Sequence, residues 1–461
     1  MSLYRDTYGD GLWRCIPFDM NASWGQLYGG SNPLEATADW SKSHPLYGGS
    51  STGGNFNRLY DVIVTLPETR QMLLRRERSI LDRMVQPPGT PAEALVLENY
   101  IRSMSNLISI EANLDRAKWG ASPWAPGKTF AQGISDLLNQ FVGPRRQHWC
   151  VTHCVTNTSK PIGTGNAQNA GIPLSQPTNL SLAVVGVDFN PAGGNQEQEY
   201  VCLSNTAPLA VDLTGWKLTG GIEFTFAPGT VLPSNGVAYV SPNTRAFKAR
   251  DAGPRGGQGL FVLGPYQGQL SARGETVQVR DALGAMAGTY SYTGAPSAAQ
   301  QFLRITEIMF HPAATLGSPL DPDAFEYLEL ANISETVTLD LTGVRLVNGI
   351  EFDFTGSAVS SLVPGARVLV VKNAAAFVAR YGTGRPVAGQ FTGNLNNAGE
   401  RIQLLDASNE EILDFSYDDD WHPLVDGLGF SLVLADPTAP PEAWNGSSQW
   451  RRAARPPARP V

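Results

Sequence analysis

An internal repeat constrains the fold of this 461-residue chain more than any other feature of its sequence. Four separate motifs of the second half recur in the same order, at offsets of 125 to 128 residues. Since order and spacing are both kept, the repeat indicates two copies of one domain, each of roughly 120 residues. The motifs pair residues 199–205 with 326–332, 212–218 with 340–346, 221–226 with 349–354, and 274–279 with 399–404.

The residue pattern inside the repeat predicts β-strands. Ile222, Phe224 and Phe226 alternate with polar residues, which places one face of a strand in a core and the other towards water. Short runs of this kind, bounded by Gly, Pro and Asn, are typical of β-sandwiches. We expect no further long helix in this half, and a short helix near residues 373–380.

The first third of the chain is predicted to be helical. Apolar residues recur at helical intervals after Pro67, and again over about 92–110 and 130–142, where Gly143-Pro144 is expected to end the third helix. We interpret the arginines between Arg70 and Arg83 as a solvated helix face rather than an anion site.

Composition excludes some partners. Charged residues are 16% of the chain, and 48 Gly with 33 Pro favour a turn-rich β protein. The net charge of −8 argues against a nucleic-acid partner, because binding to phosphates requires an excess of basic residues. No apolar run reaches the ~20 residues of a membrane-spanning helix. The polar start shows no signal peptide, so we expect the chain to begin inside a domain.

The second copy resembles a known family. Residues 305–312, 325–332 and 339–343 resemble a bacterial lamin-tail domain, and residues 180–291 resemble it more distantly. This resemblance implies an immunoglobulin-like β-sandwich for each copy. The family implies a scaffold without naming its ligand.

Residues 13–25 resemble the metal-binding segment of the spore-coat-protein-H (CotH) kinase family, and residues 57–59 and 145–148 add further matches. The resemblance implies that residues 1–155 are the C-terminal part of a kinase-like domain. It also implies that Asp19 binds Mg²⁺, with Asn21 at a second, normally acidic position. The phosphate-binding lysine and catalytic aspartate of that family would lie upstream, where this chain has no residues.

Two clusters leave alternatives open. Cys150 and Cys154 lie close to His148 and His153, which allows a metal site, buried thiols or a disulfide. The acidic residues 418–420 allow a cation site, but we interpret them as a solvated loop.

The sequence therefore predicts a multidomain α+β protein, with a mostly helical, partial kinase-like region followed by two immunoglobulin-like all-β sandwiches. We expect a non-catalytic adhesion or binding protein with no catalytic residues and no cofactor. Its ligand would be a protein or a carbohydrate surface, and the parent protein would be extracellular or in the cell envelope. The alternative is an atypical secreted kinase that uses ATP and Mg²⁺. The predicted segments are a kinase-like region (1–155), a linker (156–179), two lamin-tail domains (180–299 and 300–440) and a Pro/Arg-rich tail (441–461), which we expect to be disordered from residue 450 onward.

Overall fold

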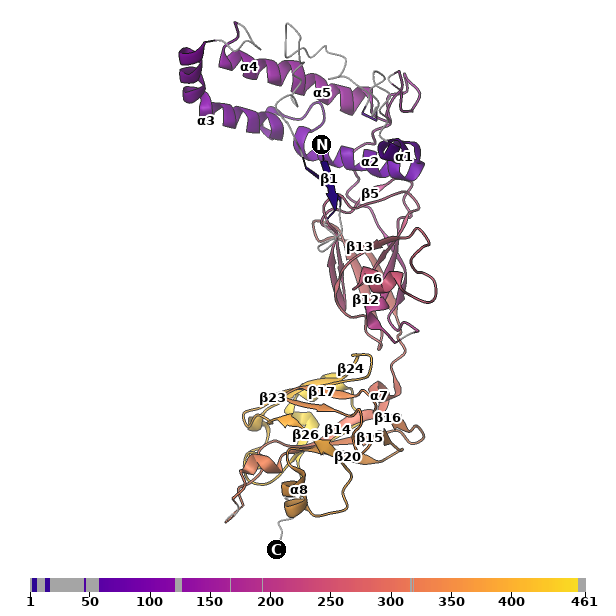
Figure 1. Ribbon diagram of the computed structural model, residues 1–461, viewed down its shortest axis with the longest axis vertical. Coiled ribbons are helices and arrows are strands. Elements are labelled where there is room, and N and C mark those ends of the chain that lie inside the picture. Colours follow the sequence, from indigo (N-terminus) through magenta and orange to yellow (C-terminus); the bar gives the residue numbers. More distant parts are fainter. Residues whose placement is uncertain are drawn as a thin grey trace.

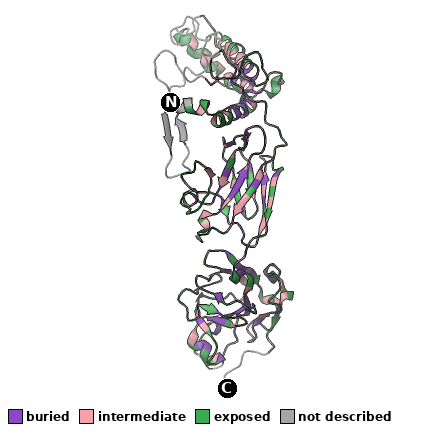
Figure 2. Cartoon of the chain, turned by 90° about the vertical axis from the view of Figure 1, so that its right-hand side faces the viewer, coloured by how far each residue is buried: buried purple, intermediate pink, exposed green. Residues whose placement is uncertain are grey.

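A computed structural model describes residues 2–5, 13–16, 45–46, 58–120, 127–165, 167–192, 194–315, 317 and 319–454. Within these residues the chain forms a helical region and two β-sandwiches, which follow one another along the long axis (Figure 1). Buried residues alternate along the strands of the sandwiches, whereas exposed residues dominate much of the helical region (Figure 2).

The helical region holds more helix than the sequence predicted. Gly143-Pro144 does not end the third helix, because the turn before it is π-helical and the amide of Gly143 bonds to Leu138 O, five residues back. Pro144 then stands in the first turn of α5, where its missing N–H is tolerated. The elements are β1 (Ser2–Arg5), β2 (Trp13–Ile16), α1 (Arg58–Thr65), α2 (Pro67–Ile80), η2 (Leu81–Val85), η3 (Ala92–Ala94), α3 (Val96–Trp119), α4 (Phe130–Asp136), η4 (Leu137–Val142), α5 (Gly143–Gln147) and η5 (His148–Thr152).

The predicted linker packs against the helices instead of extending between domains. Asn169 is fully buried and donates to the carbonyls of Cys154 (2.8 Å) and Asn157 (2.7 Å). Ala170 and Ile172 join the small core of the helical region. This segment is rich in Gly and Asn and has no hydrophobic period, so its composition did not indicate that it packs. Hydrogen bonds from one buried asparagine to backbone carbonyls hold it in place.

The first sandwich pairs a four-stranded with a five-stranded sheet. Its strand orders are β10-β9-β4-β3 and β11-β7-β6-β12-β13. The elements are β3 (Ala183–Asp188), η6 (Gln196–Gln198), β4 (Tyr200–Ser204), β5 (Val211–Asp212), β6 (Lys217–Thr219), β7 (Ile222–Thr225), β8 (Val231–Leu232), β9 (Val237–Val240), α6 (Thr244–Lys248), β10 (Phe261–Leu263), β11 (Gln267–Gly268), β12 (Glu275–Arg280) and β13 (Met286–Tyr292).

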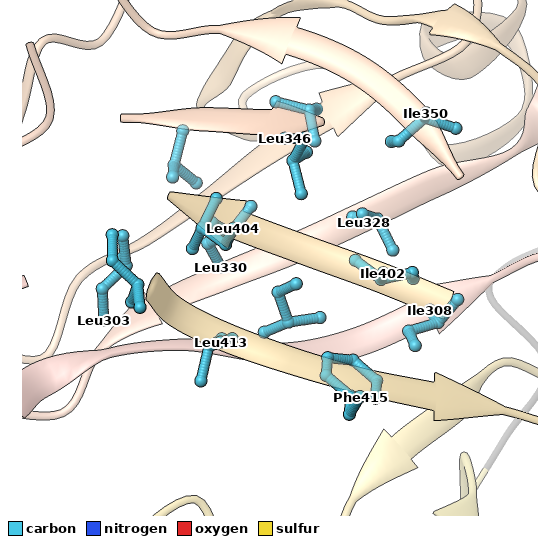
Figure 3. Packing of buried hydrophobic residues seen from close by; sticks show 14 of the residues in the cluster. Leu303, Ile308, Leu328, Leu330, Leu346, Ile350, Ile402, Leu404, Leu413 and Phe415 are labelled. Carbon is cyan, nitrogen blue, oxygen red and sulfur yellow. The ribbon is translucent and has the colours of Figure 1, made fainter. Parts of the chain in front are cut away.

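The second sandwich repeats this plan and adds two strands. Its orders are β21-β20-β15-β14-β25-β26 and β22-β18-β17-β23-β24. Side chains from both sheets interdigitate in its core, among them Leu328, Leu404 and Phe415 (Figure 3). The elements are α7 (Ala298–Phe302), β14 (Leu303–Met309), η7 (Pro322–Phe325), β15 (Tyr327–Asn332), β16 (Leu339–Asp340), β17 (Arg345–Asn348), β18 (Ile350–Asp353), β19 (Ser361–Leu362), β20 (Arg367–Val371), α8 (Ala374–Tyr381), β21 (Val387–Gln390), β22 (Thr392–Gly393), β23 (Glu400–Leu405), β24 (Glu411–Tyr417), η8 (Asp419–Trp421), β25 (Leu432–Leu434), η9 (Pro441–Asn445), η10 (Ser447–Gln449) and β26 (Trp450–Arg452).

Two predictions for this half have opposite outcomes. The short helix expected near residues 373–380 is confirmed as α8, which Asn373 caps by accepting from the amide of Ala376. The prediction of a disordered tail from residue 450 is wrong for residues 450–452, since β26 pairs with β25 and Trp450 is buried in the core together with Trp444. Burying the two indole side chains removes a large apolar area from water. This favours folding of the segment although it is rich in Pro and Arg.

Candidate binding site

The repeated glutamates just before β4 and just before β15 serve the scaffold. Glu199 accepts hydrogen bonds from Tyr266 Oη (2.6 Å) and the amide of Leu270 (3.2 Å). Glu326 accepts from the amide of Leu395 (3.0 Å). Each carboxylate ties a crossover loop to the sheet, and burial raises the pKa of both to about 8.

The Gly-Glu motif also has a structural role in each copy. Glu275 accepts from the amide of Ser271 (2.8 Å) and from Tyr292 Oη (3.0 Å). Glu400 makes the equivalent bonds to the amide of Asn396 (2.9 Å) and to Tyr417 Oη (3.2 Å).

The asparagine that ends each copy of the first motif joins separate loops. Asn205 donates to the carbonyls of Leu209 (2.8 Å) and Pro233 (2.9 Å). Asn332 donates to those of Val337 (2.7 Å) and Leu362 (2.8 Å). The duplicated polar residues are therefore occupied by the fold, and a binding site must be sought elsewhere.

The structure places some of the residues that sequence singled out. Asp19 and Asn21 lie outside the described residues. Cys150 and Cys154 are buried, free thiols. Nearby, His153 Nδ1 accepts from the amide of Ala170 (3.0 Å), so this histidine holds the buried loop. No group of three or more His, Cys, Asp or Glu side chains suited to a metal occurs among the described residues.

The acidic residues 418–420 form a capped turn. Asp418 accepts from the amide of Asp420 (2.9 Å), as expected for a short 3₁₀ segment. This geometry agrees with the interpretation as a surface loop.

The arginines of α2 do not form a solvated face. Arg75 and Arg78 are buried, and Arg75 donates to the carbonyls of Ala210 and Leu174, both at 2.8 Å. Arg76 forms an ion pair with Asp212 of β5 (3.1 Å). The prediction was wrong because the helix packs on the first sandwich, and helical periodicity does not show where another domain docks.

Another buried arginine, in α5, orients α3. Arg146 of α5 pairs with Glu98 of α3 and donates to the carbonyls of Val85 (2.8 Å) and Gln86 (3.0 Å). Gln86 Oε1 in turn accepts from the amide of Val96 (2.9 Å), at the start of α3. One side of the 24-residue helix is thereby fixed to its neighbours.

The opposite side of α3 is apolar and exposed. Its residues share one face at helical spacing, and their exposed fractions range from 37% to 71%. An apolar stripe of this length on the surface is typical of a protein-binding face. Sequence reasoning found the helix but missed that this face is exposed, although the i, i+4, i+7 spacing was visible. We call it the α3 face: Val96, Tyr100, Met104, Leu107, Ile110 and Leu114.

The structure thus defines a tandem immunoglobulin-like β-sandwich protein. The Lamin Tail Domain family model matches residues 175–294 and 296–419, which together exceed half of the chain. The chain belongs to the lamin tail domain family. The match begins at residue 175 and carries no information on the helical region. No curated protein matches the chain.

No helix within the described ranges is long and apolar enough to cross a membrane.

Proposed function

We propose that this chain is a non-catalytic binding protein that acts outside the cell or at its surface, with the two sandwiches as scaffold and the α3 face as the contact with a partner protein. The observation that carries the proposal is the apolar stripe on α3. Leu107, Ile110 and Leu114 are exposed to water, and covering them with a partner would lower the free energy of the system.

The surroundings of the face support a specific partner. Glu111 and Lys118 lie along the same side of α3, so a partner would bury apolar area beside charges of both signs. The Arg146–Glu98 ion pair fixes the opposite side of α3 to its neighbours. The α3 face therefore has a defined orientation.

Crosslinking with mass spectrometry on cells that express the full chain tests the contact. The variant Leu107→Glu, combined with Leu114→Glu, should abolish the crosslinks of α3 to its partner. Leu283→Glu is the matched control, because Leu283 is 89% exposed on a turn of the first sandwich and should change nothing. Crosslinks that survive the α3 variant would exclude this face.

The proposed location has its own test. Protease added to intact cells should digest the chain, whereas a cytosolic marker protein should resist. Protection equal to that of the marker would contradict an external location.

The kinase alternative stays a prediction, since Asp19 and Asn21, the residues expected to hold Mg²⁺, lie outside the described residues. Calorimetric titration of Mg·ATP into the chain, with Asp19→Ala as control, decides it. Saturable binding that the variant loses would support a nucleotide site, and no heat at millimolar nucleotide would exclude one.

A further inference from the structure

The two sandwiches differ at one edge. In the second, β14 lies between β15 and β25. The register places Glu307 opposite Val433 and Ile308 opposite Leu432 in an antiparallel ladder. In the first, the equivalent strand β3 is the last of its sheet, with β4 as its neighbour.

The ladders establish which residues are equivalent. Both β3 and β14 carry a bulge at the same point of their pairing with the next strand. Val187 lies opposite Val201 as Ile308 lies opposite Leu328. Gly186 and Val187 therefore occupy the places of Glu307 and Ile308, the two residues that pair with β25.

Four apolar positions beside this edge differ in their exposure to solvent between the two sandwiches. In the second sandwich all four are buried, with 2% exposure or less, whereas their equivalents are only partly buried. We call the first-sandwich set, with the outer side of β3, the open edge. The pairs are Val187 with Ile308, Phe189 with Phe310, Tyr290 with Phe415, and Tyr292 with Tyr417.

Residues 422–452 cover this side of the second sandwich. Phe415 packs on Trp444 and Trp450, with ring centroids 5.5 and 5.3 Å apart. These residues follow the family match, which ends at residue 419. Among the described residues the first sandwich has no such segment after its last strand, because the chain passes from β13 into α7 of the next domain.

Beside Gly186 and Val187 the described chain places no paired strand on the outer edge of β3, whereas β13 lies along the start of this edge, where the amide of Leu182 donates to Ala287 O (3.0 Å). Val185 is 53% exposed, and a Cβ built on Gly186 would meet no atom within 4 Å. Exposed edges are commonly protected by lysine, proline or a bulge. β3 has neither lysine nor proline. Its bulge is no barrier, since β14 has the same bulge and pairs with β25.

We propose that the open edge binds an extended segment of a partner protein as an added antiparallel strand, in the way that β14 holds β25. The segment would carry apolar side chains at alternate positions. Leu432 and Leu434 point into the core of the second sandwich, whereas the intervening Val433 is only partly buried. Main-chain hydrogen bonds would provide affinity, and the alternate side chains would provide specificity.

This surface is separate from the α3 face, so the inference goes beyond the proposed function and its test stands alone. The α3 variant Leu107→Glu should bind an added strand as the parent chain does.

The test uses a fluorescein-labelled peptide with the sequence of residues 430–453, titrated with the full chain and followed by anisotropy. Val187→Lys should weaken binding by at least about tenfold, since it places a charge against the added strand. Val237→Lys is the matched control: Val237 is 40% exposed on the interior strand β9 of the same sheet. A peptide with Leu432→Asp and Leu434→Asp should not bind.

Hydrogen exchange gives a readout that needs no variant. Binding of the peptide to the unaltered chain should slow exchange of the amides of residues 183–189. Absence of binding, or binding that Val187→Lys leaves unchanged, would overturn the proposal. Light scattering that shows a dimer, dissolved by Val187→Lys, would also overturn it, because a second copy would then occupy the edge.

Discussion

Glu199 and Glu326 are carboxylates that the fold buries at equivalent places, and each has one oxygen without a hydrogen-bond partner among the described atoms. Burial raises the pKa of both to about 8 from an ordinary 4.5. Between these pH values the native state holds protons that the unfolded state has lost. The free energy of unfolding should therefore fall as pH rises from about 4.5 to about 8.

Replacement of both residues, Glu199→Gln with Glu326→Gln, should flatten this dependence. At pH 8.5 the double variant should be more stable than the parent by on the order of a few kcal/mol, since no charge is buried. Denaturant unfolding at a series of pH values measures the slope. Glu335→Gln, on an exposed carboxylate, is the control, and an unaltered slope in the double variant would contradict the prediction.

Trp444 is one of the two buried indoles with which residues 422–452 cover the second sandwich. It is fully buried, and its carbonyl accepts from the indole of Trp450 (2.9 Å). Trp444→Ala should destabilise that domain by about 3–5 kcal/mol, through lost burial and a cavity. Leu424→Ala, on an exposed side chain of the same segment, should have little effect in the same thermal unfolding experiment.

At the scale of elements, α2 joins the helical region to the first sandwich through buried guanidinium groups. Arg75→Ala would leave the carbonyls of Ala210 and Leu174 without this donor. We expect the variant to lower the free energy of unfolding by about 2–4 kcal/mol. Limited proteolysis should then cut between the helices and the sandwich earlier than in the parent. Arg83→Ala, at an exposed position after α2, should leave the cleavage rate unchanged.

The sequence predicted helices and strands, whose signal lies in neighbouring residues. It did not predict contacts between residues that are distant in the chain. Alternation marked the strands around Phe224 and Phe352, and the repeat revealed both sandwiches. The docking of Arg75 and the burial of Trp444 depend on surfaces distant in the sequence. Periodicity and composition carry no information about those surfaces, because both describe a residue by its neighbours in the chain. The same limit hid the packing of residues 167–172.

For the whole molecule, Glu410 links the two sandwiches. Its carboxylate accepts from Gln269 (2.9 Å) and the amide of Ala272 (3.3 Å) of the first sandwich. Arg273 donates to Ile412 O (2.7 Å) beside it. These hydrogen bonds between loops of the two sandwiches hold the domains in one arrangement. The interface between the domains is therefore sensitive to the loss of a single hydrogen-bond acceptor.

Glu410→Ala should loosen this interface without unfolding either domain. Small-angle scattering should show a broader distribution of interdomain distances, while circular dichroism stays the same. Glu411→Ala provides the matched control, because its side chain is exposed. An identical scattering profile for the parent and Glu410→Ala would show that other contacts fix the interface.

The order of strands along the chain has a consequence for synthesis. β14 leaves the ribosome well over a hundred residues before β25, its neighbour in the finished sheet. Throughout that interval the nascent second sandwich has the same bare edge that the first sandwich keeps. The last-made segment therefore completes the sheet, and a ribosome that stalls before residue 432 releases a chain in which both β3 and β14 are the last strands of their sheets.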